Sequence, residues 1–289
     1  KFSYENGMVI DLGQRFFDDG QPPETIGETE VVTRDLADIF QLLLKNVDFL
    51  SQIPNPVVEG KDLFNAAIFI YEGEVKHVSY KALLPTYDIF DECRYFEPGD
   101  SFSTIAFKGK RIALTVCEDI WNIGNENPLY TICPMDEVMP ESPDLMINIS
   151  ASPFAADHTD ERFHILRANV KRYNLPLFYI NHVGAQTELI FDGGSTVMNA
   201  DGEIWDEMPF FEESVRIYEL DEVDAEEPRK VQEKERIPLI HDGLILGIRD
   251  YFSKLGFEKA ILGLSGGIDS SVATVLAVNA LGAENVHVL

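Results

Sequence analysis

The chain has 289 residues, of which 45% are hydrophobic, and its formal net charge at pH 7 is −27. This length allows one large core, or one domain and part of a second. The negative charge opposes nucleic-acid binding, because the phosphate backbone would be repelled. We find no apolar run long enough to span a membrane and no signal-peptide pattern. Three cysteines do not suggest a disulfide framework, so we expect a reducing, cytoplasmic setting.

The first three quarters of the chain predict an α/β layered domain. Apolar residues three and four apart predict an amphipathic helix at residues 34–50, whereas residues 1–27 show no clear period. Short apolar runs separated by turns then predict strand pairs. In chain order we expect strands at residues 64–71, 75–80, 103–107, 111–116 and 145–149, a helix at 160–173, and strands at 177–181, 194–199 and 203–205.

A charged stretch at residues 221–237 is typical of a solvated linker. Beyond it we expect a helix at 239–255, a short buried strand at 259–264, a glycine-rich turn leading into a helix that ends near 281, and a strand from 286. The pattern therefore divides the chain into four parts. They are an N-terminal segment that we assign to no domain (1–55), a layered domain (56–220), the linker (221–237) and the start of a second α/β domain (238–289).

A cysteine and a lysine stand at the ends of predicted strands in the layered domain. Cys117 directly follows an apolar strand at a turn into a helix, where backbone N–H groups and the helix end would lower the thiol pKa. A buried, inert cysteine is the alternative. Lys81 ends a hairpin strand, and its ammonium would stabilise a thiolate and an oxyanion in a shared pocket. We interpret Cys93 and Cys133 as incidental.

The segments at residues 81–87, 90–92 and 117–121 resemble the carbon–nitrogen hydrolase (nitrilase) superfamily, and within it the glutaminase domain of NAD synthetases. The resemblance covers residues 56–220 and implies a nitrilase-like αββα sandwich. It implies that Cys117 attacks the side-chain amide of L-glutamine. Lys81 would hold the oxyanion together with the N–H of Glu118, and Glu92 would orient Lys81.

The same resemblance implies a glutamine-binding set, and one position departs from the family pattern. At His158 a family member more often has Lys or Arg. The implied residues are Tyr87, Glu118, Ser152 and His158.

The general base of the family has no counterpart in this sequence. The superfamily uses a glutamate that follows a buried strand near the N-terminus. The first fifty residues offer glutamates only in polar sequence without strand pattern, at Glu5, Glu24, Glu28 and Glu30. We therefore expect weak or absent ammonia release from glutamine, because nothing obvious removes the thiol proton.

A second motif, Ser-Gly-Gly-Ile-Asp-Ser-Ser, lies between a predicted strand and a predicted helix. Small residues let the backbone approach a phosphate, and the N–H groups and helix end bind the anion. An ordinary capped turn is the alternative. The motif resembles the pyrophosphate-binding loop of the N-type ATP pyrophosphatases, such as the NAD, GMP, asparagine and argininosuccinate synthetases, and implies a Rossmann-like parallel fold. The implied ATP-binding residues are Gly263, Leu264, Ser265, Gly266, Gly267, Ile268, Asp269, Ser270 and Ser271, with Mg²⁺ held by Asp269.

Together the two resemblances imply glutamine-dependent NAD synthesis, with L-glutamine, ATP and deamido-NAD as substrates and a homo-oligomeric whole protein. A stand-alone amidase and an inactive fragment are the alternatives. We expect the chain to be incomplete for both reactions. We also expect residues 238–289 to be the least secure part, because their strand has one possible partner and their helices have apolar faces with too little sheet to cover.

Overall fold

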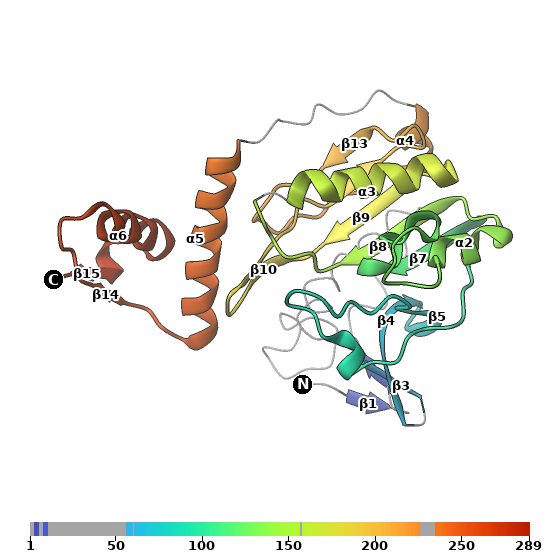
Figure 1. Ribbon diagram of the computed structural model, residues 1–289, viewed down its shortest axis with the longest axis horizontal. Helices are drawn as coiled ribbons and strands as arrows, with labels where there is room; N and C mark the ends of the chain where they lie inside the picture. Colours follow the sequence, from blue (N-terminus) through green and yellow to red (C-terminus); the bar gives the residue numbers. More distant parts are fainter. Residues whose placement is uncertain (1–2, 6–7, 11–55, 60, 157, 226–234) are drawn as a thin grey trace.

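The computed structural model describes residues 3–5, 8–10, 56–59, 61–156, 158–225 and 235–289. Two β-sheets and the helices beside them form a large body, and a smaller body lies beyond the long helix α5 (Figure 1). The helix predicted at residues 34–50 lies outside the described residues. No described helix is long and apolar enough to cross a membrane.

The first sheet is antiparallel and has the order β1-β2-β3-β4-β5. The predicted hairpin at residues 64–80 is confirmed as β4 and β5. Glu72 and Gly73 connect them with φ values of 53° and 75°, as a tight hairpin turn requires. The strands are β1 (Ser3–Glu5), β2 (Met8–Ile10), β3 (Pro56–Glu59), β4 (Asp62–Tyr71) and β5 (Glu74–Tyr80).

The second sheet has the order β13-β12-β9-β8-β7-β6, in which β7, β8 and β9 are parallel and the outer strands antiparallel. Every residue of β8 and β9 is buried, as expected for central parallel strands covered on both faces. The strands are β6 (Ile105–Phe107), β7 (Lys110–Val116), β8 (Leu145–Ser150), β9 (Leu177–Asn181), β12 (Thr196–Met198) and β13 (Ile204–Glu207).

The residues of β7 alternate between two cores. Leu114 packs with Phe69 of β4 between the two sheets, and the Ser79 hydroxyl of β5 donates to the Leu114 carbonyl at 2.6 Å. Ala113 packs on the other face with Leu166 of α3. The helices of this layer are α2 (Pro134–Val138), followed by the 3₁₀ turn η5 (Met139–Glu141), and α3 (His158–Tyr173). The predicted sheet-on-sheet core with a helical outer layer is therefore confirmed.

A hairpin that the sequence pattern did not reveal joins the large body to α5. Its strands are β10 (Val183–Gln186) and β11 (Leu189–Asp192), and α5 (Arg236–Leu255) packs along it. Asp250 of α5 accepts from the Ala185 N–H at 2.7 Å, and the Lys254 ammonium donates to the Ala185 carbonyl at 2.5 Å. Two side chains of α5 thus bind the two main-chain groups of one hairpin residue, Ala185.

Helices occupy both described ends of the stretch predicted as a linker at residues 221–237. The helix α4 (Leu220–Ala225) occupies its beginning, and Val223 is fully buried in the core between the sheets. The charged residues of α4 dominate its composition, but Leu220 and Val223 are three residues apart and share the side facing the core. At the other end, α5 begins at Arg236 instead of 239, because Pro238 is tolerated in a first helical turn.

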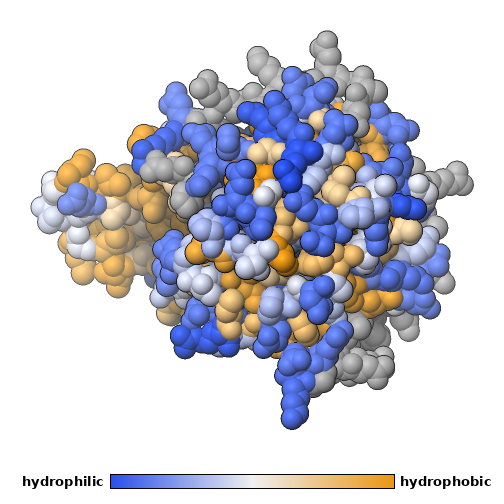
Figure 2. All heavy atoms as spheres, turned by 45° about the vertical axis from the view of Figure 1, so that its right-hand side comes forward, coloured by the Kyte–Doolittle hydropathy of each residue, from blue (hydrophilic) through white to orange (hydrophobic). Residues whose placement is uncertain are grey.

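The small body is a βαβ unit built from β14 (Ala260–Leu262), α6 (Ile268–Leu281), the turn η6 (Ala283–Asn285) and β15 (Val286–Val288). As predicted, β14 pairs in parallel with β15 and, among the described residues, with no other strand. The expectation of a buried strand was wrong, because Ile261 is 72% exposed. Apolar surface gathers on the projecting body of Figure 2, from Ile261, Leu264, Ile268, Val272, Val275 and Leu289.

A buried histidine lies where the β10–β11 hairpin packs against α5. His182 is 1% exposed, and neither ring nitrogen has a hydrogen-bond partner among the described residues. Its ring meets Phe191 edge-on, with 4.9 Å between centroids. Burial lowers the pKa of His182 to about 4, and the charge of Lys254 acts in the same direction.

We expect the neutral state of His182 to make the protein acid-sensitive. Between about pH 6.5 and pH 4 the unfolded chain binds a proton at this residue and the folded chain does not, so the free energy of unfolding falls as the pH falls. The loss amounts to roughly 3 kcal/mol across this window and stops below the folded pKa. Urea unfolding of the natural protein and His182→Leu at pH 7, 5.5 and 4 measures it. Parallel stability curves for the two proteins would contradict the assignment.

Candidate active site

Cys117 lies in a strained turn at the end of β7. Its φ of 45° is unusual for a residue other than glycine and places it at the start of the 3₁₀ turn η3 (Cys117–Ile120). The Asn148 side chain of β8 holds this turn, donating to the Cys117 carbonyl at 3.3 Å and to the Thr115 hydroxyl at 3.0 Å. The sequence expectation of a strand-end cysteine is therefore confirmed.

Asp119 connects the cysteine turn to the segment that follows β5. One carboxylate oxygen accepts from the N–H groups of Ala82 and Leu83 at 2.9 and 3.0 Å, and the other accepts from the Val116 N–H at 3.0 Å. Three hydrogen bonds from backbone to one buried carboxylate fix the distance between the two strand ends. Sequence reasoning did not assign this role to Asp119.

Lys81 is a buried cation paired with a carboxylate. It is 1% exposed, and its ammonium lies 2.5 Å from Glu92 of the turn η2 (Glu92–Arg94). The Asn65 amide makes a longer contact of 3.4 Å with the other oxygen of Glu92. Burial disfavours the ammonium, but a Cys117 thiolate and the carboxylates of Glu92 and Asp119 raise the pKa of Lys81 above its ordinary value. The lysine is therefore charged at neutral pH.

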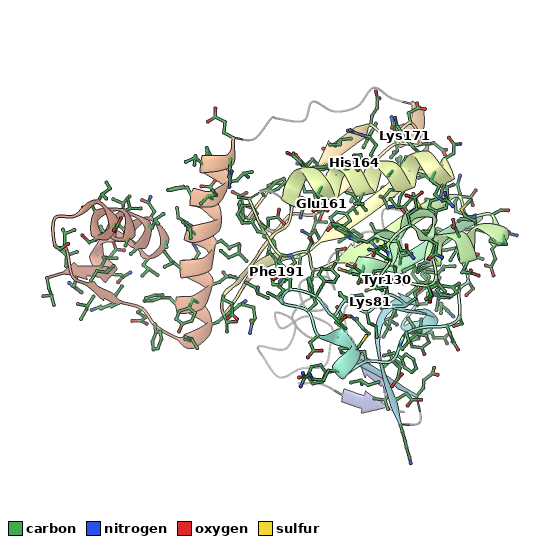
Figure 3. The ribbon with its side chains drawn as sticks, viewed as in Figure 1. Lys81, Tyr130, Glu161, His164, Lys171 and Phe191 are labelled. Carbon is green, nitrogen blue, oxygen red and sulfur yellow. The ribbon has the colours of Figure 1, made fainter. Side chains whose placement is uncertain are left out.

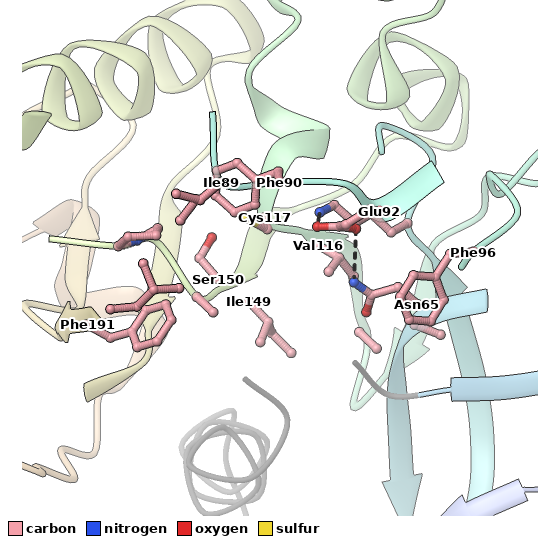
Figure 4. Close-up of a pocket in the computed structure, with 16 residues that line it drawn as sticks. Asn65, Ile89, Phe90, Glu92, Phe96, Val116, Cys117, Ile149, Ser150 and Phe191 are labelled. Atoms are coloured by element: carbon pink, nitrogen blue, oxygen red, sulfur yellow. Dashed lines mark hydrogen bonds and ion pairs between the residues drawn. The ribbon is translucent and has the colours of Figure 1, made fainter. Parts of the chain in front are cut away.

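Lys81, Glu92 and Cys117 line one cavity of about 210 Å³ (Figure 4). The structure thus brings together the three residues that the sequence nominated for catalysis. The walls of the cavity are mainly apolar. They include Ala66, Ala67, Ile89, Phe90, Phe96, Val116, Ile149, Pro153, Leu189 and Phe191.

The pKa of the Cys117 thiol is raised, and the sequence expectation of a lowered pKa was wrong. Burial is the largest cause, while Lys81 and a hydrogen bond from the Ala151 backbone act in the opposite direction. The sequence shows the strand-end position but not the density of protein around the sulfur. The resting thiol is therefore protonated, and forming the nucleophile requires a proton acceptor.

The structure does not supply this acceptor from the residues it describes. Within that part of the chain no carboxylate is hydrogen-bonded to the Cys117 sulfur, and Glu92 is engaged with Lys81. Three of the N-terminal glutamates considered above, Glu24, Glu28 and Glu30, lie outside the described residues.

Two tyrosines converge on Glu118, the residue after the nucleophile. Tyr87 and Tyr130 both donate to one oxygen of its carboxylate, at 2.9 and 2.7 Å. Burial and the Glu118 carboxylate raise the pKa of both phenols, so they remain donors. The sequence nominated Tyr87 and Glu118 but not Tyr130, which lies on an irregular loop without a pattern that would have identified it.

The sequence also nominated Ser152 and His158 for binding glutamine. Ser152 lies next to the cavity, and the side chain of His158 is not described. Ser152 donates its backbone N–H to Asn181 at 2.9 Å, and its neighbours Ala151 and Pro153 line the cavity. His158 is the first residue of α3, and its side chain lies outside the described part.

The two remaining cysteines have no comparable setting. Cys93 is exposed and contacts the Leu84 carbonyl, while Cys133 is buried against the Tyr173 hydroxyl at 3.2 Å. Among the three thiols, Cys117 is therefore the one that lines the cavity with a buried cation.

The glycine-rich loop and the first turn of α6 form the second candidate site. The helix α6 begins at Ile268, so Ile268, Asp269, Ser270 and Ser271 form its first turn. The hydroxyls of Ser270 and Ser271 donate to the Gly267 carbonyl at 3.1 and 2.8 Å. Gly266 has a φ of 83°, which only glycine adopts easily. The Ser271 N–H donates to the Gly267 carbonyl at 3.2 Å, whereas the N–H groups of Ile268, Asp269 and Ser270 at the helix start are available to an anion.

The fold, with a strand-end cysteine beside a buried lysine–glutamate pair, has the arrangement of nitrilase-type proteins. The sequence profile of the carbon–nitrogen hydrolase family matches residues 47–230, more than half of the chain, and the chain belongs to this family. A second profile, that of NAD synthase, matches residues 240–289.

Curated relatives and a solved structure are similar to this chain over most of its length. The glutamine-dependent NAD(+) synthetase of Synechocystis is 40% identical over 235 residues, covering 78% of this chain and 41% of that protein. The enzyme of the same name from Acinetobacter baylyi is 32% identical, with coverage of 93% and 48%. The glutamine-dependent NAD+ synthetase of Acinetobacter baumannii in complex with ADP has a TM-score of 0.72 and 31% identity, covering 87% of this chain and 48% of that one. The chain spans about half the length of the curated relatives it matches.

Proposed function

We propose that the large body hydrolyses the side-chain amide of L-glutamine at Cys117. The thiolate attacks the amide carbon, and Lys81 together with the Glu118 N–H stabilises the oxyanion. Collapse of this intermediate breaks the carbon–nitrogen bond, and the nitrogen takes up the proton that the thiol gave up and leaves as ammonia. Water then hydrolyses the thioester to glutamate and the free thiol. Glu92 holds Lys81 in place. Among the described residues no carboxylate is hydrogen-bonded to the sulfur of Cys117 and could accept the thiol proton. We therefore expect formation of the thiolate, and with it ammonia release, to be slow.

We propose that the small body binds the pyrophosphate part of ATP for NAD synthesis. The N–H groups at the start of α6 and the loop from Gly263 to Ser271 suit a polyphosphate, and the serine hydroxyls add donors. Adenylation of the deamido-NAD carboxylate releases pyrophosphate, and the attacking ammonia displaces AMP. Asp269 is exposed at this turn, and a single carboxylate suits Mg²⁺ carried on phosphates, whose charge the ion would neutralise.

The observation that carries the proposal is the cavity that unites Lys81, Glu92 and Cys117 in a chain similar to glutamine-dependent NAD synthetases. The cytoplasm suits three free thiols, and the resemblance implies that the whole protein is a homo-oligomer. The match of residues 240–289 to NAD synthase disfavours a stand-alone amidase.

We expect the chloromethyl ketone analogue of glutamine to alkylate Cys117 in preference to the other two cysteines. Lys81 favours the Cys117 thiolate, and the cavity holds the analogue beside the sulfur. Peptide mapping after partial reaction measures the adducts, and Cys117→Ser should take up no reagent at this position.

Two further measurements sharpen this test. An excess of L-glutamine should slow the labelling of Cys117 but not that of exposed Cys93. Faster labelling of Cys93 in the folded protein, or labelling of Cys117 that glutamine does not slow, would exclude a glutamine site at Cys117.

A further inference from the structure

The backbone of Ala151 contacts the sulfur of Cys117. Ala151 directly follows β8 and lines the same cavity, and its N–H donates a hydrogen bond to the sulfur. Such a donor stabilises a thiolate more than a thiol, because the charged sulfur accepts the stronger hydrogen bond. Further along the same loop, Pro153 forms an antiparallel bridge with Phe191 of β11, which Figure 3 labels. The direction of the Ala151 N–H therefore depends on how this loop is held.

The loop is held on both sides of Ala151 by the end of β9. On one side, the Ser150 carbonyl accepts from the His182 N–H at 3.0 Å. On the other side, the Ser152 N–H donates to the side-chain oxygen of Asn181 at 2.9 Å. Two consecutive residues thus fix the peptide groups that flank Ala151, one through its main chain and one through its side chain.

The side chain of Asn181 has a defined orientation. It is 5% exposed, and its amide nitrogen donates to Asp192 at 3.0 Å and to the Gly193 carbonyl at 2.9 Å. The guanidinium of Arg162 holds Asp192 in turn. Two acceptors on one side of the amide and one donor on the other allow a single placement of its nitrogen and oxygen. The oxygen is therefore directed at the Ser152 N–H.

We propose that Asn181 is a positioning residue, which holds the loop after β8 so that the Ala151 N–H stabilises the Cys117 thiolate. The inference rests on the proposed amide hydrolysis at Cys117 and adds a residue that acts on the nucleophile only through the main chain. Lys81 follows a strand of the first sheet and Ala151 a strand of the second. The thiolate is thus stabilised from both sheets.

The pH dependence of Cys117 alkylation by iodoacetamide tests the proposal without requiring turnover, because only the thiolate reacts. Peptide mapping gives the rate at each pH, and the midpoint of the curve gives the pKa of the thiol. Asn181→Leu offers no acceptor to the Ser152 N–H, so we expect it to move this midpoint about one pH unit higher. Asn181→Ser is too short to reach the same N–H and should reproduce the shift, also if Asn181→Leu does not fold.

Ser195→Ala is the matched control. The Ser195 hydroxyl accepts from the main-chain N–H of Asn181 at 2.9 Å, so its loss disturbs the same residue but leaves the hydrogen bond from Ser152 in place. We expect the midpoint of this variant to equal that of the natural protein. An unchanged midpoint in both Asn181 variants would overturn the inference. An equal shift in Ser195→Ala would also overturn it, because it would indicate a general disturbance of the strand end.

A second measurement separates the inference from the function on which it rests. An excess of L-glutamine should slow the labelling of Cys117 in the natural protein. If it does not, the proposed function fails. The midpoints are measured without glutamine, so a higher midpoint in the Asn181 variants would still show that Asn181 acts on the thiolate.

Discussion

Replacing Lys81 with methionine is expected to slow alkylation of Cys117 by the glutamine chloromethyl ketone roughly 100-fold or more, because the cation that favours the thiolate and the oxyanion is lost. The same change should lower the free energy of unfolding by about 3–5 kcal/mol, since it leaves Glu92 without its partner in a largely buried site. Peptide mapping and urea unfolding measure the two effects.

A double variant separates these effects. In Lys81→Met/Glu92→Gln the uncompensated carboxylate is also removed, so most of the stability should return while alkylation stays slow. Recovery of alkylation in the double variant would show that Lys81 acts only through the fold. An unchanged alkylation rate in Lys81→Met would remove Lys81 from the proposed mechanism.

The second large effect is expected at a buried ion pair between α3 and β11. Arg162 donates to both oxygens of Asp192 at 2.9 and 2.7 Å, and Asn181 donates to one of them at 3.0 Å. Asp192→Asn leaves a buried guanidinium without its counter-charge, so the free energy of unfolding should fall by about 3–5 kcal/mol.

Urea unfolding checks this prediction, with an exposed pair as the matched control. Asp91→Asn breaks the contact with Arg94, where both side chains are more than half exposed, and should change stability little. Equal effects of Asp192→Asn and Asp91→Asn would contradict the argument from burial. A double variant with Arg162→Met and Asp192→Leu should recover most of the loss, because neither charge remains buried.

Periodicity was sufficient to predict the central strands, and the strand ends then indicated the catalytic candidates. Residues 145–149 and 177–181 are short apolar runs between turns, and both are core strands in the structure. Lys81 follows β5 and Cys117 follows β7, and these strands belong to different sheets. Packing of the two sheets was predicted, and it brings the two residues to one cavity. The chemical roles of the two residues remain predictions.

Other contacts of the site join residues that are distant in the sequence and meet only in the folded chain. Local sequence patterns do not reveal such contacts. Asp119 bonds to backbone atoms more than thirty residues away, and Tyr130 reaches Glu118 from an irregular loop. The rise in the Cys117 pKa comes from the crowding of many residues. α4 was hidden by its charged residues, although Val223 belongs to the core.

The hydrogen-bond partners of Asp119 are all main-chain N–H groups. Substitutions at the partner positions should therefore be tolerated, whereas substitution of Asp119 itself should not. Any residue except proline at positions 82, 83 or 116 still offers the same N–H, so the side chains there are free to be chosen for packing alone. At position 119, by contrast, two oxygens must point in two directions at once, and a shorter, longer or amide side chain loses at least one of them. The spacing between Lys81 and Cys117 thus depends on the side chain at position 119, whereas the side chains at positions 82, 83 and 116 can vary.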